Sequence, residues 1–218
     1  MQSRQIKVAV SLVMIAAAAV TVAFRYYRPL PKLEPGPHLG IGQSLAERAA
    51  KLLQSGGRII LITPDTQANR FPGAAIQLKA FHEALQRAGL SVAATNIIKL
   101  DPNRVTRAPP GDFADILRKN KEADVVVSLL GPPVLSPEQK TRVGEKHPKV
   151  VAVCSGDMPR QIKLRPLFAD NLLHAAILSR PSPSPNLPAS GKPADWFSHF
   201  FLWITPENVI DLPDGGGK

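Results

Sequence analysis

The sequence predicts an α/β fold, a three-layer αβα sandwich built on a mostly parallel sheet and preceded by one N-terminal transmembrane helix. Short runs of consecutive apolar residues alternate with segments whose apolar residues recur at helical spacing. Continuous apolar runs are typical of strands that are buried on both faces of a parallel sheet. Their alternation with helices therefore predicts a parallel sheet with helices on both faces.

The individual elements follow from periodicity and from start and stop residues. The predicted strands are 58–63 (RIILIT), a segment within 90–100, 124–130 (DVVVSLL) and 149–154 (KVVAVC). The predicted helices are 44–54, 72–88, 112–121 and one that opens at Ser136. Ser136, Pro137 and Gln139 combine a capping serine, a proline in the first turn and a glutamine three residues after the serine. This is the pattern of a helix start with a capping box.

The last third of the sequence has a less regular pattern. Residues 172–178 fit either a strand or a helix, and the proline-rich residues 181–193 predict an extended loop. Seven large apolar residues then follow within nine positions: Trp196, Phe197, Phe200, Phe201, Leu202, Trp203 and Ile204. We expect this aromatic segment to fold back over the sheet or its edge, with FLWIT as a strand. An exposed patch that docks a partner or a membrane is the alternative.

The amino terminus carries one apolar run, Val8–Phe24, with basic residues on both flanks. Three interpretations stay open: an uncleaved membrane anchor, a cleaved signal peptide with small residues at 21–23, and a buried core helix. The anchor is favoured because Arg25 and Arg28 would resist translocation directly after a cleavage site. The short basic tail before the run favours its retention inside, which places the domain outside the cytoplasm.

These patterns divide the chain into four parts. The predicted parts are a signal anchor at 1–28, a proline-rich stalk at 29–43, one α/β domain at 44–211 and a disordered tail at 212–218. Four prolines between residues 29 and 37 predict the stalk, because proline fixes φ and removes an amide donor.

Composition excludes several classes of protein. Hydrophobic residues make up 44% and charged residues 20% of the 218 residues, which is typical of a globular protein rather than a disordered one. The net charge is +10, but the lysines and arginines are scattered, so a basic surface near anionic lipid is expected rather than a nucleic-acid partner. No metal-ligand spacing and no phosphate-binding glycine loop occurs, so neither a metal nor a cofactor is predicted.

The stretch Leu39–Leu178 resembles one lobe of the type I periplasmic binding proteins, of the branched-chain amino-acid-binding kind. The likeness rests on RIILIT followed by Pro-Asp-Thr at 64–66, on QLKAFHEALQRAG at 77–89, on DFADILRKNKEA at 112–123 and on the strand ADVVVSLLG at 123–131. The resemblance implies a ligand-binding α/β lobe. Members of the family clamp a ligand between two lobes, and this stretch has the length of one, so no particular ligand is carried over.

Polar and glycine-bearing loops follow three of the predicted strands, at the edge where open parallel sheets bind ligands. The candidate ligand-binding residues are Asp65, Thr66, Gln67, Asn69, Gly131, Ser155 and Asp157. Their side chains or backbone can hydrogen-bond to a small polar ligand. The alternative is that these residue types only form turns.

No residue is assigned a catalytic role. The single cysteine, Cys154, is expected to be a small buried apolar residue, because no base is adjacent to it in sequence. An enzyme would require His82, His147 or His174 within hydrogen-bond reach of Cys154 or Asp65.

Three hypotheses for function follow. The first is a membrane-anchored, extracytoplasmic binding or interaction domain without catalysis, which recognises a small polar ligand or a protein partner at the strand carboxyl ends. The second is a structural or assembly protein that docks through the aromatic segment, and the third is an enzyme that uses the same loops. The sequence makes no prediction of oligomeric state.

Overall fold

The computed structural model of the chain describes residues 10, 12–22, 33–53, 57–66, 71–100, 107–156 and 163–211. The chain divides into two compact units, Met1–Leu33 and Glu34–Lys218, and each is considered separately. In the first unit, residues 10 and 12–22 are helical. Within the described ranges, no helix combines the length and apolar character needed to cross a membrane. Much of the predicted anchor at 1–28 and all of the predicted tail at 212–218 lie outside the described residues.

The second unit is built on one six-stranded sheet with the strand order β2-β1-β3-β4-β5-β6. The strands are β1 (Ile59–Pro64), β2 (Val92–Ile98), β3 (Val125–Ser128), β4 (Lys149–Cys154), β5 (Ala175–Ser179) and β6 (Phe201–Ile204). The first five strands are parallel, and β6 runs antiparallel to β5. The mostly parallel sheet that the sequence predicts is confirmed.

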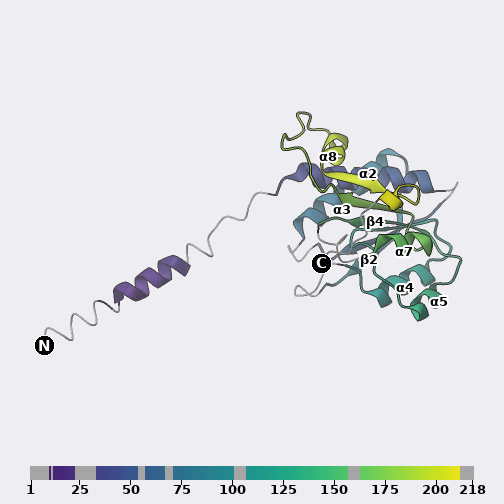
Figure 1. The fold of residues 1–218 in the computed structure, drawn as a ribbon, viewed down its shortest axis with the longest axis horizontal. Coiled ribbons are helices and arrows are strands. Elements are labelled where there is room, and N and C mark those ends of the chain that lie inside the picture. Colours follow the sequence, from purple (N-terminus) through teal and green to yellow (C-terminus); the bar gives the residue numbers. More distant parts are fainter. Residues whose placement is uncertain are drawn as a thin grey trace. The chain divides into compact units, whose positions relative to one another are not determined.

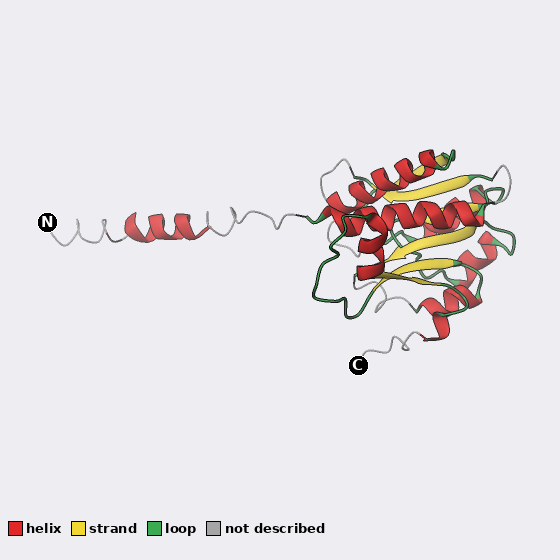
Figure 2. Ribbon diagram, turned by 90° about the horizontal axis from the view of Figure 1, so that it is seen from above, coloured by secondary structure: helices red, strands yellow, loops and turns green. Residues whose placement is uncertain are grey.

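Helices cover both faces of this sheet, and Figure 2 shows helices lying over the strands and running roughly along them. They are α2 (Pro35–Leu52), α3 (Pro72–Arg87), α4 (Pro110–Lys119), α5 (Pro137–Val143), α7 (Leu164–Ala169) and α8 (Pro193–Phe200), followed by the short 3-10 helix η1 (Val209–Asp211). In Figure 1, α2, α3 and α8 lie on one side of the strands and α4, α5 and α7 on the other.

Each buried strand supplies side chains to two separate apolar clusters. In β1, Ile60 and Ile62 belong to the cluster under α4, α5 and α7, while Ile59 and Leu61 belong to the cluster under α2 and α3. Successive side chains of a strand point to opposite faces, so a strand between two helix layers must be apolar at every position. The uninterrupted run RIILIT follows directly from this requirement.

Helix α2 begins at Pro35, well before the predicted start at residue 44. Residues 35–43, which the sequence pattern assigned to an extended stalk, are therefore helical. Proline is compatible with the first turn of a helix, where its missing N–H has no partner to lose. Glycines in this part of the helix lie against other helices: a Cβ on Gly36 would clash with the ring of Trp196, and one on Gly42 would clash with the Gln77 carbonyl oxygen.

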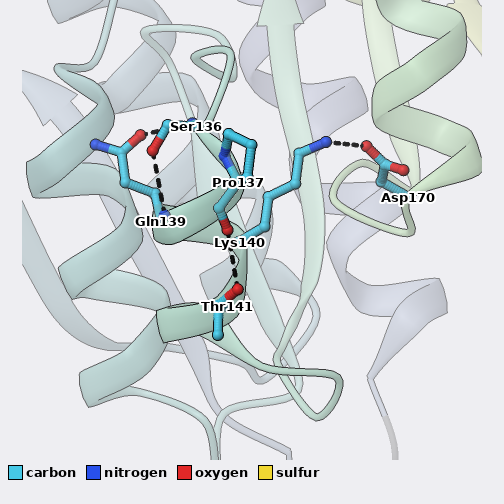
Figure 3. Close-up of polar contacts among 6 residues, drawn as sticks. All are labelled: Ser136, Pro137, Gln139, Lys140, Thr141 and Asp170. Carbon is cyan, nitrogen blue, oxygen red and sulfur yellow. Dashed lines mark hydrogen bonds and ion pairs between the residues drawn. The ribbon is translucent and has the colours of Figure 1, made fainter.

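The predicted capping box at the start of α5 is confirmed (Figure 3). The amide of Gln139 donates to Ser136 Oγ at 3.2 Å, and the Ser136 amide donates to Gln139 Oε1 at 2.9 Å. One turn further on, Lys140 Nζ donates to Asp170 Oδ2 at 2.5 Å, which connects α5 with the residue that ends α7. These contacts fix the helix that follows β3.

The carboxyl-terminal third resolves the alternatives that the sequence left open. The segment 172–178 includes four of the five residues of β5, and the unpredicted short helix α7 precedes it. The FLWIT segment forms β6, which pairs with β5 as an edge strand, and α8 leads directly into it. The prediction that the aromatic segment folds back onto the sheet edge is confirmed.

Candidate functional site

The strands β1 and β3 are neighbours in the sheet, and the order in which strands are added reverses between them: β2 lies beyond β1 on one side, and β4 to β6 lie beyond β3 on the other. Helix α3, which follows β1, contributes Phe81 and Leu85 to one apolar cluster. Helix α5, which follows β3, contributes Val143 to the cluster on the opposite face. The loops that leave β1 and β3 therefore diverge to opposite faces. In open α/β sheets this divergence opens a crevice at the strand carboxyl ends, where ligands bind.

The loop after β1 begins with two half-buried polar residues, Asp65 and Thr66. The Asp65 amide donates to the Ile98 carbonyl oxygen at 3.2 Å, so the backbone of the loop is held against the end of β2. The preceding Thr63 is 2% exposed, and its hydroxyl donates to the Pro64 carbonyl oxygen at 3.2 Å. The backbone around Pro64 and Asp65, at the end of β1, is thus held by hydrogen bonds to the end of β2 and to the Thr63 hydroxyl.

The loop after β3 is a buried turn organised by one hydroxyl. Ser128 is fully buried, its Oγ donates to the Gly131 carbonyl oxygen at 3.1 Å, and it accepts the Leu130 amide at 3.3 Å. Gly131 has a φ of +70°, in the left-handed region that favours glycine. The Leu130 carbonyl oxygen in turn accepts the Ala108 amide at 3.3 Å, which connects this turn to the start of α4.

The loop after β4 presents Ser155, which is half-buried, followed by Gly156 with a φ of +68°. The Gly156 amide donates to Ser179 Oγ at 3.2 Å. Ser179 is the last residue of β5, so the neighbouring strand holds this turn in place.

The structure brings part of the predicted site together. Asp65 and Thr66 follow β1 and Ser155 follows β4, with β3 between these two strands. Two strand spacings separate them, or about 10 Å. Gly131 is buried within the turn after β3, and as a glycine it can offer only backbone atoms to the site. Gln67, Asn69 and Asp157 lie outside the described residues.

Sequence reasoning missed three hydroxyl residues at this edge: Thr63, Ser128 and Ser179. Each lies near the carboxyl end of its strand: Thr63 bonds to the last carbonyl of β1, Ser128 to the turn after β3, and Ser179 to the turn after the neighbouring strand β4. The available signal was the single polar residue near the end of each apolar run, as in DVVVSLL. Their contacts show that they shape the loops.

Cys154 has the properties of a packing residue. It is fully buried in the cluster under α4, α5 and α7, and burial raises the pKa of its thiol to about 12. His174 bonds to Val150, four residues earlier in β4 and about 13 Å away along the strand. His82 is exposed on α3, which packs against the other face of the sheet. Neither of these two histidines is therefore placed to act as a base for Cys154.

The aromatic side chains of α8 and β6 pack on one another and on α2. Trp196 stacks on Phe200 with ring centroids 5.9 Å apart, and Phe197 contacts Trp203 at 5.8 Å. The Arg48 guanidinium of α2 lies over the Trp203 ring, 5.6 Å from its centroid. These residues therefore cover the cluster beneath α2 and α8.

The part of the chain that the structure describes contains no group of three or more His, Cys, Asp and Glu side chains placed to hold a metal ion.

Comparisons with known proteins point to the fold. No protein-family model and no curated protein matches the chain. Among solved structures, a substrate-binding protein of a sugar ABC transport system from Bordetella parapertussis 12822 matches with a TM-score of 0.50 and 13% identity, over 81% of this chain and 58% of that one. A sugar-binding protein of a sugar ABC transporter from Bacillus halodurans matches with a TM-score of 0.48 and 12% identity, over 79% and 63%.

The Caulobacter myo-inositol binding protein, bound to myo-inositol, matches with a TM-score of 0.45 and 13% identity, over 80% of this chain and 60% of that one. This chain thus spans less than two thirds of the length of each of these structures. The Bordetella match supports the predicted fold of the type I periplasmic binding proteins. The narrower resemblance to branched-chain amino-acid-binding members is not confirmed by these matches.

Proposed function

We propose that this chain is a non-catalytic binding domain that recognises a small polar ligand at the carboxyl ends of β1, β3 and β4. The observation that carries the proposal is the divergence of the loops after β1 and β3 to opposite faces of the sheet. In open α/β sheets, ligands bind in the crevice at such a point, outside the carboxyl ends of the strands.

The residues at this edge suit a ligand rich in hydroxyl groups. The Asp65 carboxylate accepts hydrogen bonds, and the Thr66 and Ser155 hydroxyls both donate and accept them. All three are half-buried, so part of each side chain is shielded from water and part is accessible. Because the Bordetella neighbour is named as a sugar-transport protein, sugars and polyols are the first ligand class to test.

The second part of the proposal is location. The apolar run Val8–Phe24 with its basic flanks is the basis for proposing a single membrane anchor with the domain outside the cytoplasm. Extraction of membranes at alkaline pH tests the anchor, since a spanning segment stays with the lipid. A chain that is released into the alkaline supernatant would contradict this part of the proposal and leave the binding site untouched.

Docking through the aromatic segment is the competing function. The helix α8 has no fully buried residue, so its aromatic rings keep some accessible surface. The contacts of Trp196 with Phe200, of Phe197 with Trp203, and of Trp196, Phe197 and Trp203 with α2 give these rings a packing role inside the domain. The loop site therefore remains the preferred proposal.

A thermal-shift screen of the full chain in mild detergent tests the binding proposal. The panel contains sugars, polyols, amino acids, nucleotides and small organic acids. A ligand at 100 times its Kd stabilises the native state by about 2.7 kcal/mol. For a domain of this size that is a rise in Tm of roughly 5–10 °C. A panel that leaves Tm unchanged would contradict the proposal.

Matched variants locate the effect. Asp65→Ala and Ser155→Ala should reduce the shift caused by a ligand. Glu122→Ala and Ser91→Ala remove the same chemical groups from exposed positions before β3 and β2, at the opposite edge of the sheet, and should keep the shift in full. Equal shifts in all four variants would show that the ligand binds elsewhere.

A further inference from the structure

His174 holds the backbone of Val150 at two points where the β4–β5 pair begins. The His174 amide donates to the Val150 carbonyl oxygen at 2.8 Å, and the Val150 amide donates to the His174 ring at Nδ1, 3.1 Å away. The regular pairing of the two strands starts one residue further on, with Val151 opposite Ala175. The imidazole ring therefore accepts a backbone hydrogen bond directly before the regular pairing of β4 with β5 begins.

This contact fixes the protonation state of the ring. An imidazole nitrogen that accepts a backbone N–H carries no proton, so the neutral ring has its proton on Nε2. Burial, together with the smaller electrostatic effects of His147 and Lys149, lowers the pKa of His174 to about 4. The His147 ring stands nearly edge-on to the His174 ring, with centroids 6.3 Å apart and planes at 83°.

The carboxylates on neighbouring elements have other partners. Asp170, at the end of α7, accepts from Lys140, and Asp124, before β3, accepts the Arg58 amide at 2.9 Å. The remaining charged residues in the segment before β4 are the exposed Glu145 and Lys146. The charges that act on the His174 ring are therefore those of His147 and Lys149, and both oppose its protonation.

Strand β5 carries the carboxyl-terminal part of the sheet. It pairs with β6, and the Arg180 amide donates to the Phe200 carbonyl oxygen at 2.8 Å, at the junction of α8 and β6. We call residues 175–204 the C-terminal module, which comprises β5, α8 and β6. Besides the packing of α8 and β6 on α2, the module is joined to the sheet by the four residue pairs between β4 and β5, next to the contact of His174 with Val150.

We propose that His174 is a pH-sensitive latch that fastens the C-terminal module to the rest of the sheet. At neutral pH the unprotonated Nδ1 accepts the Val150 amide. On acidification a proton binds Nδ1, the amide loses its acceptor, and a new positive charge stands beside Lys149 and His147. The pairing of β4 with β5 is then weakened at the end where it begins, next to Val150 and His174.

The direction of the pH effect follows from the depressed pKa in the folded state. The unfolded chain binds a proton on this ring at about 6.5, and the folded chain only at about 4. The latch is therefore fully fastened above pH 6.5, and its contribution to stability is lost as the pH falls from 6.5 toward 4.

Tryptophan fluorescence tests the latch directly, because both tryptophans of the chain, Trp196 and Trp203, lie in the C-terminal module. The experiment follows emission and far-UV circular dichroism of the full chain from pH 7.5 to 4. His174→Asn is the decisive variant, since the asparagine amide oxygen can take the place of Nδ1 as acceptor and does not titrate. His147→Asn is the control for the neighbouring ring.

The proposal predicts a change in emission of the unmodified chain within the pH 6.5 to 4 window, with most of the circular dichroism signal retained. The change should be absent in His174→Asn and present in His147→Asn. Constant emission of the unmodified chain, or the same transition in His174→Asn, would overturn the proposal. So would loss of the transition in His147→Asn alone, because that result assigns it to His147.

A measurement on the unmodified chain covers the case in which His174→Asn does not fold. Nitrogen-15 NMR of the histidine rings should show His174 as the Nε2–H tautomer at pH 7, with a midpoint well below 6.5. An Nδ1–H tautomer, or a midpoint near 6.5, would overturn the latch.

Discussion

Gly40 of α2 lies directly against the backbone of Phe197 in α8: a Cβ built on Gly40 would stand 2.9 Å from the Phe197 nitrogen. The same Cβ would stand 2.7 Å from the Pro193 carbonyl oxygen. Backbone atoms cannot turn aside as side chains can, so the two helices approach this closely only because residue 40 is glycine. This part of the predicted proline-rich stalk is thus a packing surface.

Replacing this glycine should separate the two helices. Gly40→Ala gains helix propensity of about 1 kcal/mol but forces α8 away from α2, and overpacking of this kind costs about 1–3 kcal/mol. We expect a net loss of stability in urea unfolding. Gly111→Ala is the matched control: it also lies in a helix, nothing lies within 4 Å of its Cβ position, and it should be neutral or stabilising. Equal behaviour of the two variants would refute the close contact.

The buried Ser128 hydroxyl should be worth more than an ordinary surface serine. Ser128→Ala leaves the Leu130 amide without its acceptor and the Gly131 carbonyl without its donor, in a turn that excludes water. Such unsatisfied groups cost about 1–3 kcal/mol. Chemical denaturation measures the loss, with the exposed Ser91→Ala as control. A change under about 0.5 kcal/mol would mean that the turn does not depend on this hydroxyl.

Cys154 should be chemically silent in the folded protein. With a pKa of about 12, its thiol is deprotonated in only about one molecule in ten thousand at pH 8, and it is also buried. A thiol reagent such as iodoacetamide should label less than a tenth of the folded chain in the time that labels the urea-unfolded chain completely. Rapid stoichiometric labelling of the folded chain would instead indicate an accessible thiolate and reopen the enzyme hypothesis.

The capping box of α5 offers a local test of the helix that follows β3. Ser136→Ala removes the acceptor of the Gln139 amide and should cost about 1 kcal/mol. Ser136→Asp supplies another capping oxygen and should keep most of the stability. If both variants lose the same amount, the contribution of Ser136 does not come from its hydrogen bond to Gln139.

The sequence predicted the strands well because the sheet imposes a strong local pattern. Strand β4, at Lys149–Cys154, coincides with the predicted run KVVAVC, since a strand that is buried on both faces must be apolar throughout. The start of α5 was predicted equally well, because a capping box is a local hydrogen-bond pattern with its own residue signature.

The amino-terminal turns of α2 were not predicted, because they depend on contacts between helices and not on a local sequence pattern. Glycine and proline at 35–42 weaken an isolated helix, and only the contacts of Gly36, Gly40 and Gly42 with α8 and α3 make them favourable. The short helix α7 was missed as well. It is six residues long and contains Pro166, so it lacks both periodicity and a clear helix-forming composition.

The sequence predicted which edge of the sheet the described candidate residues occupy, but not what each of them does there. Asp65, Thr66 and Ser155 directly follow the carboxyl ends of β1 and β4, as expected for residues after parallel strands. Nothing in the sequence distinguishes a glycine that contacts a ligand from one that makes a buried turn, as Gly131 does with Ser128. That distinction depends on tertiary contacts.

A nitrogen-15 NMR titration of the full chain tests the central claim most directly, because each backbone amide reports binding at its own position. The titrants are the sugars and polyols of the ligand panel, added one at a time. The proposed site predicts that the largest shifts fall on the amides of Asp65, Thr66, Ser155 and Gly156. Shifts confined to the indole signals of Trp196 and Trp203, or spectra that do not change with any titrant, would contradict it.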